Sequence, residues 1–202
     1  MKETIAQDAK VHTHRKITKV KLTKSKTLDV AFEETITIIK MVDGKEEITT
    51  VNADNVRTGK NIIHDDMVDA LALLRSHLAI LCDQVEAQNI SYYDLEDNEE
   101  ALSKYRVNSY SVGGSDIHEG VTLTGTRFGK GGAPLNLNSP FTKFEGSDNE
   151  DTYENSFELR GMINHCNEEA LKYVDGKMAP DAQLDLFDQE EESAGDSEDM
   201  NF

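Results

Sequence analysis

Tryptophan, cysteine and long apolar runs are scarce or absent in this sequence of 202 residues. There is no Trp, and the two cysteines, Cys82 and Cys166, lack CxxC or HxC spacing. We therefore expect two reduced thiols, partly buried on helices, and neither a disulfide framework nor a zinc site. No apolar run reaches the roughly 18–20 residues of a membrane-spanning helix, and the first residues do not form a signal peptide. These absences predict a cytoplasmic protein with no membrane partner, no metal and no cofactor.

Basic residues are also in the minority, and the net charge is −18. The charge is uneven, because residues 10–28 hold seven bases and no acid, whereas residues 145–158 hold six acids and no base. Residues 181–202 hold nine acids and no base. Residues 1–144 have 18 bases against 21 acids, a difference of −3, so the main body is nearly neutral with a basic end. A phosphate-binding face is therefore compatible with the acidic total.

The first part of the chain predicts three antiparallel strands. Residues 16–26 alternate apolar side chains with Lys and Thr, although the period slips at Lys19. Residues 28–42 are rich in β-branched side chains, and the Asp-Gly pair at 43–44 is a strong hairpin signal before a third strand at 47–51.

Helical and strand patterns alternate in the rest of the chain. Apolar side chains recur at helical spacing over residues 67–85, after two acids at 65–66 that suit a helix start. Residues 106–112 and 120–128 are further strand candidates, followed by short apolar alternation up to residue 144. A final helix is predicted over residues 156–175.

Three strands, a helix and then more strands is the order of an oligonucleotide-binding (OB) barrel, a mainly β fold. We expect an OB-fold-like antiparallel barrel over residues 16–178, with one internal helix and a C-terminal helix packed on it. A flexible basic arm at 1–15 and a disordered acidic tail at 179–202 would flank it. The same order also fits another small α+β sandwich.

The acidic tail ends on an aromatic residue with a free carboxylate. Such a ring can enter an apolar pocket rimmed by Lys or Arg, with about 2 kcal/mol from burial and steering by the preceding acids. The tail resembles the C-terminal tip of bacterial and phage single-stranded DNA-binding proteins, an acidic run that ends in a hydrophobic residue and Phe and recruits replication and repair enzymes. Those tips usually carry Pro where this chain has Asn201. The resemblance implies a recruiting tip with Asp199, Met200 and Phe202.

A second peptide, at residues 183–187, reads Gln-Leu-Asp-Leu-Phe. It resembles the pentapeptide by which polymerases and repair factors bind the bacterial sliding clamp. An extended segment can insert Leu186 and Phe187 into one pocket while the Gln183 amide forms hydrogen bonds at a second. The resemblance implies that these residues and Leu184 bind a replication or recombination protein, with the sliding clamp as one candidate. The alternative is the end of an amphipathic helix packed on the domain.

Aromatic and basic residues interleave in the strand regions, as a single-stranded DNA groove requires. Each base stacked on a ring contributes about 1–3 kcal/mol, and Lys or Arg meets the phosphates. For each ring, a place in the core is the alternative, because the chain has only six Tyr and seven Phe. The predicted DNA-binding residues are Lys16, Lys19, Lys21, Lys24, Lys26, Tyr105, Arg106, Tyr110, Arg127, Phe128, Lys130 and Lys143, with Lys104, Phe141 and Phe144 as neighbouring candidates.

These patterns predict sequence-independent binding of single-stranded DNA in replication, recombination and repair. No nucleophile has a paired base in the sequence, so we expect no enzymatic activity. If a phage encodes the protein, it would act in the cytoplasm of the bacterial host, and a homodimer is compatible with these predictions. The alternative function is an adaptor or inhibitor that docks on the sliding clamp, or mimics DNA with its acidic surface, and never touches nucleic acid.

Overall fold

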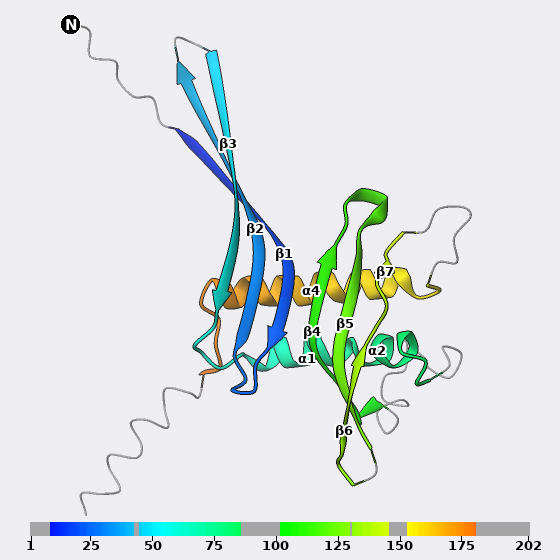
Figure 1. Cartoon of the computed structure of the whole chain (residues 1–202). Helices are drawn as coiled ribbons and strands as arrows, with labels where there is room; N and C mark the ends of the chain where they lie inside the picture. Colours follow the sequence, from blue (N-terminus) through cyan, green and yellow to red (C-terminus); the bar gives the residue numbers. More distant parts are fainter. Residues whose placement is uncertain (1–8, 43–44, 86–101, 130, 146–152, 181–202) are drawn as a thin grey trace, which may run out of the picture.

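A computed structural model describes residues 9–42, 45–85, 102–129, 131–145 and 153–180, which form a mainly β fold (Figure 1). The strands are β1 (Lys10–Leu22), β2 (Leu28–Val42), β3 (Lys45–Thr58), β4 (Tyr105–Gly113), β5 (Gly120–Phe128), β6 (Pro134–Asn138) and β7 (Thr142–Lys143). The helices are α1 (Asp65–Leu73), α2 (Arg75–Leu81) and α4 (Ser156–Val174), with a short 3₁₀ helix η2 (Asp116–His118). The predicted mainly β class, with helix between the third and fourth strands and a C-terminal helix, is confirmed.

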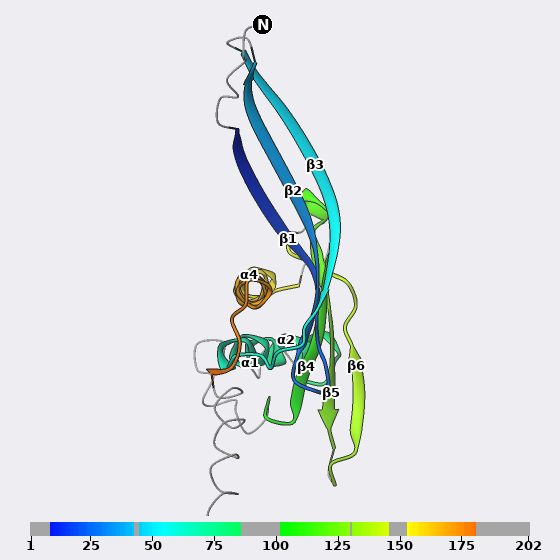
Figure 2. The ribbon, with the colours of Figure 1, turned by 90° about the vertical axis from the view of Figure 1, so that its left-hand side faces the viewer.

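The sheet is open and antiparallel, and it does not close into the expected barrel. Its strand order is β3-β2-β1-β4-β5-β6, with β7 paired to β5, so β3 and β6 lie at opposite ends of this order. Helices α1, α2 and α4 lie together against one face of the sheet (Figure 2). The helices therefore bury the apolar side of the strands, which in a barrel would be buried by closure.

The core lies between this sheet face and the helices. Across β2, β1, β4 and β5 the register places Val30, Val20, Tyr110 and Leu123 side by side, and all are buried. The helices contribute buried Leu74, Leu78, Leu159 and Ile163 to the same cluster. Truncating one of these leucines to Ala would cost about 2–5 kcal/mol of stability.

The helical run predicted over residues 67–85 is divided at Leu74, which ends α1 and begins α2. The cap of α1 is His64, whose Nδ1 accepts a hydrogen bond from the backbone N–H of Asp66 at 3.2 Å. Asp65 and Asp66 lie in the first turn, where their charge complements the helix dipole. The predicted C-terminal helix matches α4 closely.

Strand β1 begins earlier than predicted, so residues 10–15 of the expected flexible arm belong to the sheet. Residues 1–8 lie outside the described part of the chain. β2 and β3 pair up to Val42 and Lys45, on either side of the predicted turn at 43–44, which is itself outside the described residues. Figure 1 shows one half of β1, β2 and β3 projecting beyond the helices as a long twisted ribbon.

Candidate nucleic-acid interface

A β-bulge in β1 determines which of its lysines lie on the face without helices, called here the uncovered face. The register to β2 shifts between Ile17 and Lys19, so Thr18 is an extra residue. Ile17 and Val20 are therefore both buried in the core, and Lys19 and Lys21 both point to the opposite side, where they are exposed. The slip of period in the sequence is this bulge.

Hydroxyl side chains continue the lysine rows across the sheet. In register with Lys19 lies Ser111 of β4, and Thr122 of β5 lies beyond it. In the next row, Lys21 is followed by Ser109 and Thr124. The Thr124 hydroxyl donates to Asn138 Oδ1 of β6 at 2.8 Å, which extends this row by an amide. The uncovered face thus presents cations at β1 and hydrogen-bonding groups over β4 to β6.

Two exposed rings lie at the two ends of β5 on this face. Phe128 ends the strand, and alternation places it on the side of Thr122 and Thr124, at the margin of this face, where it also lines a pocket together with Ile62 and Val68. At the other end, Phe141 covers Gly120, where an added Cβ would be 2.8 Å from its Cζ. The two rings are 41% and 49% exposed, enough for a base to stack on either.

The tight turn between β1 and β2 carries two further cations. Thr23 and Thr27 close the turn through a backbone hydrogen bond of 2.9 Å and a contact of 2.8 Å between their hydroxyls. Lys26 adopts φ 58°, a conformation that a turn of this shape requires. Lys24 and Lys26 are exposed in this turn, which directly follows Lys19 and Lys21 along the chain, and Lys26 also lines a pocket with Ile62 and Val68.

Carboxylates on β2 and β3 bound the basic strip of Lys19 and Lys21. Asp29 is in register with Lys21, Glu33 is in register with Lys16, and Asp54 of β3 lies beyond Glu33. These acids share the uncovered face by strand alternation. The basic part of that face is therefore limited to β1 and its turn.

Two tyrosines predicted to stack on bases lie in the core. Tyr105 and Tyr110 are 2% and 1% exposed, so no base can reach their faces in this structure. The Tyr110 hydroxyl donates to Asn167 at 2.9 Å, and burial raises its pKa well above the ordinary value. The candidate ring of Phe144 is also buried.

Around Tyr105, the cations that interleave with rings in the sequence contact an aromatic ring inside the fold. Lys104 Nζ and Arg127 Cζ lie 5.6 and 6.0 Å from the centre of its ring, a cation–π geometry. Arg127 also donates to Gln84 Oε1 at 2.8 Å. These contacts hold Arg127 within the fold instead of at the predicted DNA groove.

The remaining predicted DNA-binding residues lie on several different strands or outside the described residues. Lys16 is half-buried and forms an ion pair with Glu119 at 2.8 Å, Arg106 is exposed on β4, and Lys143 is half-buried in β7. Lys130 lies outside the described residues, as do all the predicted partner-binding residues: Gln183, Leu184, Leu186, Phe187, Asp199, Met200 and Phe202.

The hydroxyl rows of β4 and β5 were missed in the sequence analysis. Their signal was a period of two, in which Ser109 and Ser111 alternate with apolar residues of β4, and Thr122, Thr124 and Thr126 alternate with Val, Leu and Gly of β5. Because these side chains are small and uncharged, neither an aromatic ring nor a charge marks them in the sequence.

Over the described ranges, no helix is long and apolar enough to cross a bilayer, and no three metal-ligating side chains gather into a group. No protein-family model, curated protein or solved structure matches the chain. The geometry of the uncovered face and the sequence of the tail are therefore the features that point to a function.

Proposed function

We propose that this chain binds single-stranded DNA without reading its sequence, and that residues 181–202 recruit replication or recombination proteins to the covered strand. One observation carries the proposal: Lys19 and Lys21 enter rows of hydroxyl side chains between two exposed rings, Phe128 and Phe141. Ammonium groups meet phosphates, hydroxyls bond phosphate or sugar oxygens, and rings stack on any base. Such contacts do not distinguish one base from another.

The arrangement favours a single strand over a duplex. A ring that stacks on a base needs an unpaired, exposed base face, which a duplex does not offer along its length. Phe128 and Phe141 are also separated by the length of β5, so an extended strand could reach both. The proposed action is passive coverage, without chemistry on the DNA.

The first test compares a labelled thymidine oligonucleotide with a duplex of equal length by fluorescence anisotropy. The protein should bind the single strand more tightly, in a salt-dependent manner. For the double variant Lys19→Gln/Lys21→Gln, the slope of log K against log salt should fall by about 1.4, since each lost phosphate contact contributes about 0.7. A matched control, Lys40→Gln/Lys45→Gln, makes the same charge change on the ribbon and should leave the slope unchanged. Equal losses in both variants would contradict binding at the uncovered face.

Stacking is tested by removing one ring. Phe141→Ala should weaken binding by about 1–3 kcal/mol, the contribution of one stacked base. Phe157→Ala is the control, because Phe157 is 83% exposed but lies on α4, on the other side of the sheet. Loss of affinity only in the Phe157 variant would place the strand on the helical side and refute the assignment.

Absence of single-strand binding by the full chain and by a chain ending at Pro180 would overturn the proposal. The adaptor function would then be the better account, with residues 183–187 as the docking peptide. A pull-down with the bacterial sliding clamp would test it.

A further inference from the structure

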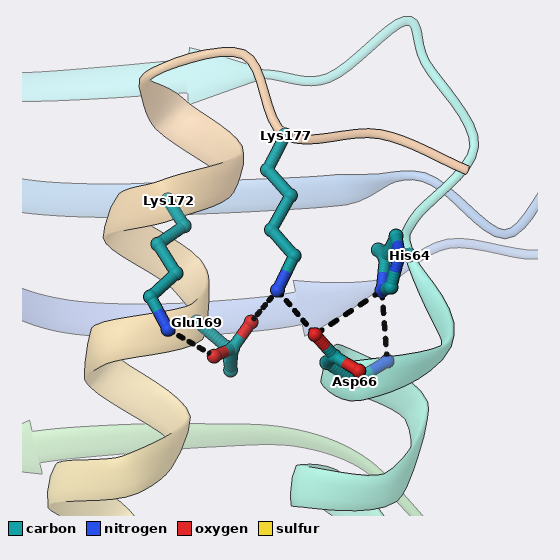
Figure 3. A network of polar contacts seen from close by, with 5 residues as sticks. All are labelled: His64, Asp66, Glu169, Lys172 and Lys177. Carbon is teal, nitrogen blue, oxygen red and sulfur yellow. Dashed lines mark hydrogen bonds and ion pairs between the residues drawn. The ribbon is translucent and has the colours of Figure 1, made fainter. Parts of the chain in front are cut away.

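The chain follows a fixed path after α4. Lys177 donates to Glu169 of α4 at 2.7 Å and also to Asp66 of α1 (Figure 3). Burial opposes ionisation of Glu169, but Lys177 and Lys172, whose Nζ lies 2.6 Å from Glu169 Oε1, outweigh it and hold the Glu169 pKa below its ordinary value. Farther on, the Ala179 N–H donates to the Ile62 carbonyl at 3.1 Å. These contacts direct the chain to the segment that precedes α1.

A groove of about 490 Å³ lies where this path ends, and Ala179 is part of its wall. The other walls come from the end of β1, the segment before α1, α1 and the start of β4, and are mainly apolar. Ile62, Val68 and Phe128 line it, although they are large apolar side chains that are 42%, 45% and 41% exposed. Lys26, Arg75 and Arg106 add positive charge at this groove, and Asp65 is an acid among its lining residues.

The groove runs beside an open strand edge. β1 pairs with β4 only through Lys19–Lys21 and residues 109–111. Within the described residues, the start of β4, from Tyr105 to Val107, pairs with β5 alone. Its outer edge faces the groove, which is lined by Tyr105, Arg106 and Val107. An unpaired edge beside an apolar floor is the arrangement that accepts an extended peptide as an added strand.

We propose that residues 183–187 of the same chain occupy this groove as an added strand when no partner protein holds them. Leu184 is five residues beyond Ala179, and an extended chain of that length spans up to about 17 Å. Because Ala179 already lies in the wall, the peptide reaches the groove without any rearrangement of the fold. A short tether also gives a local concentration in the millimolar range.

The chemistry of the peptide matches that of the groove. In an extended peptide Leu184 and Leu186 project to one side, suited to the apolar wall of α1. Asp185 projects to the other side and complements Arg106, and further acids flank the peptide. The final Phe202 is a poorer occupant because it is much farther along the chain. The groove would thus shield the recruiting peptide until a tighter partner takes it.

The test uses the absence of Trp from the sequence. Leu186→Trp in the full chain gives a single Trp on the side of the docking peptide that faces the apolar wall. Its emission should lie at shorter wavelength than that of a synthetic peptide of residues 181–189 with the same substitution. Adding Val68→Asp, which places a charge in the groove wall, should return the emission to the wavelength of the peptide. Val51→Asp is the matched control, because Val51 is 50% exposed on β3, and it should leave the emission unchanged.

These measurements contain no DNA, so they stand or fall independently of the proposed DNA binding. A single-Trp chain that emits like the free peptide would overturn the proposal. A short-wavelength emission that survives Val68→Asp would place the peptide elsewhere and overturn it as well. Emission that depends on protein concentration would identify the tail of a second copy as the occupant, against the intramolecular assignment. Release by Leu184→Ser in the same background, at unchanged thermal stability, would support it.

Discussion

From the burial of His77 we predict that the fold loses stability as the pH falls from 6.5 to about 4. Its side chain lies in α2 and is fully buried, with Nδ1 2.9 Å from the hydroxyl of Tyr153. The two rings meet edge to face, with centres 5.8 Å apart. Burial disfavours the charged imidazolium and lowers the His77 pKa from 6.5 to about 4.

The sign of the effect follows from proton binding. Between pH 6.5 and about 4, the unfolded chain binds a proton at His77 that the folded chain does not bind. The contribution of the neutral His77 side chain to the free energy of unfolding is therefore complete above pH 6.5. It falls by about 1.4 kcal/mol for each pH unit below that value. Over the whole window the loss is about 3 kcal/mol, a large share of the stability of an ordinary domain.

The assay is chemical denaturation at intervals from pH 7.5 to pH 4, on the parent protein and on His77→Gln. Many carboxylates titrate near the lower end of this range, so the difference between the two stability curves is what isolates His77. This difference should change in favour of the variant by about 3 kcal/mol on going from neutral pH to pH 4. A difference that stays constant would mean equal His77 pKa values in both states and would refute the reasoning.

Three further predictions concern the network, the ring platform and the tail. Glu169→Gln should lower the denaturation midpoint at pH 7, and this difference from the parent should shrink as the pH falls below the ordinary carboxyl range, because the folded pKa is depressed and the stabilisation is lost as the carboxylate is protonated. Gly120→Val should destabilise the fold and weaken DNA binding together, since a Cβ there would meet the Thr142 carbonyl oxygen at 2.4 Å and displace Phe141. Removing residues 181–202, which carry nine acids, should raise the affinity for single-stranded DNA in anisotropy titrations.

The fold class was predictable because local periodicity identifies the elements. The β-branched run of β2 and the helical spacing in α4 each correspond to one element of the structure. Closure of the sheet was not predictable in this way. A barrel and an open sheet covered by helices both bury one side of every strand, so the two give the same alternation in sequence.

The candidate site was predictable only in part, and burial explains the difference. Lys19 and Lys21 were identified from their charge, which keeps them at the surface. Tyr105 and Tyr110 have the same amphipathic character whether they stack on a base or complete a core with no Trp to fill it. Only the register, which sets Tyr110 beside Val20 and Leu123, places that ring inside.

The bulge in β1 allows the role of Lys19 to be tested at a constant fold. Deleting Thr18 leaves Ile17, Lys19, Val20 and Lys21 in regular alternation, with the two apolar residues still toward the helices. Deleting Lys19 instead also restores alternation, but Thr18 then occupies the position of the lysine. The two deletions remove the same bulge and should have similar unfolding midpoints, yet only the second removes a cation from the uncovered face. Its slope of log K against log salt for single-stranded DNA should therefore be smaller by about 0.7. Equal slopes at equal stability would show that Lys19 does not contact the strand, and its assigned role would be refuted.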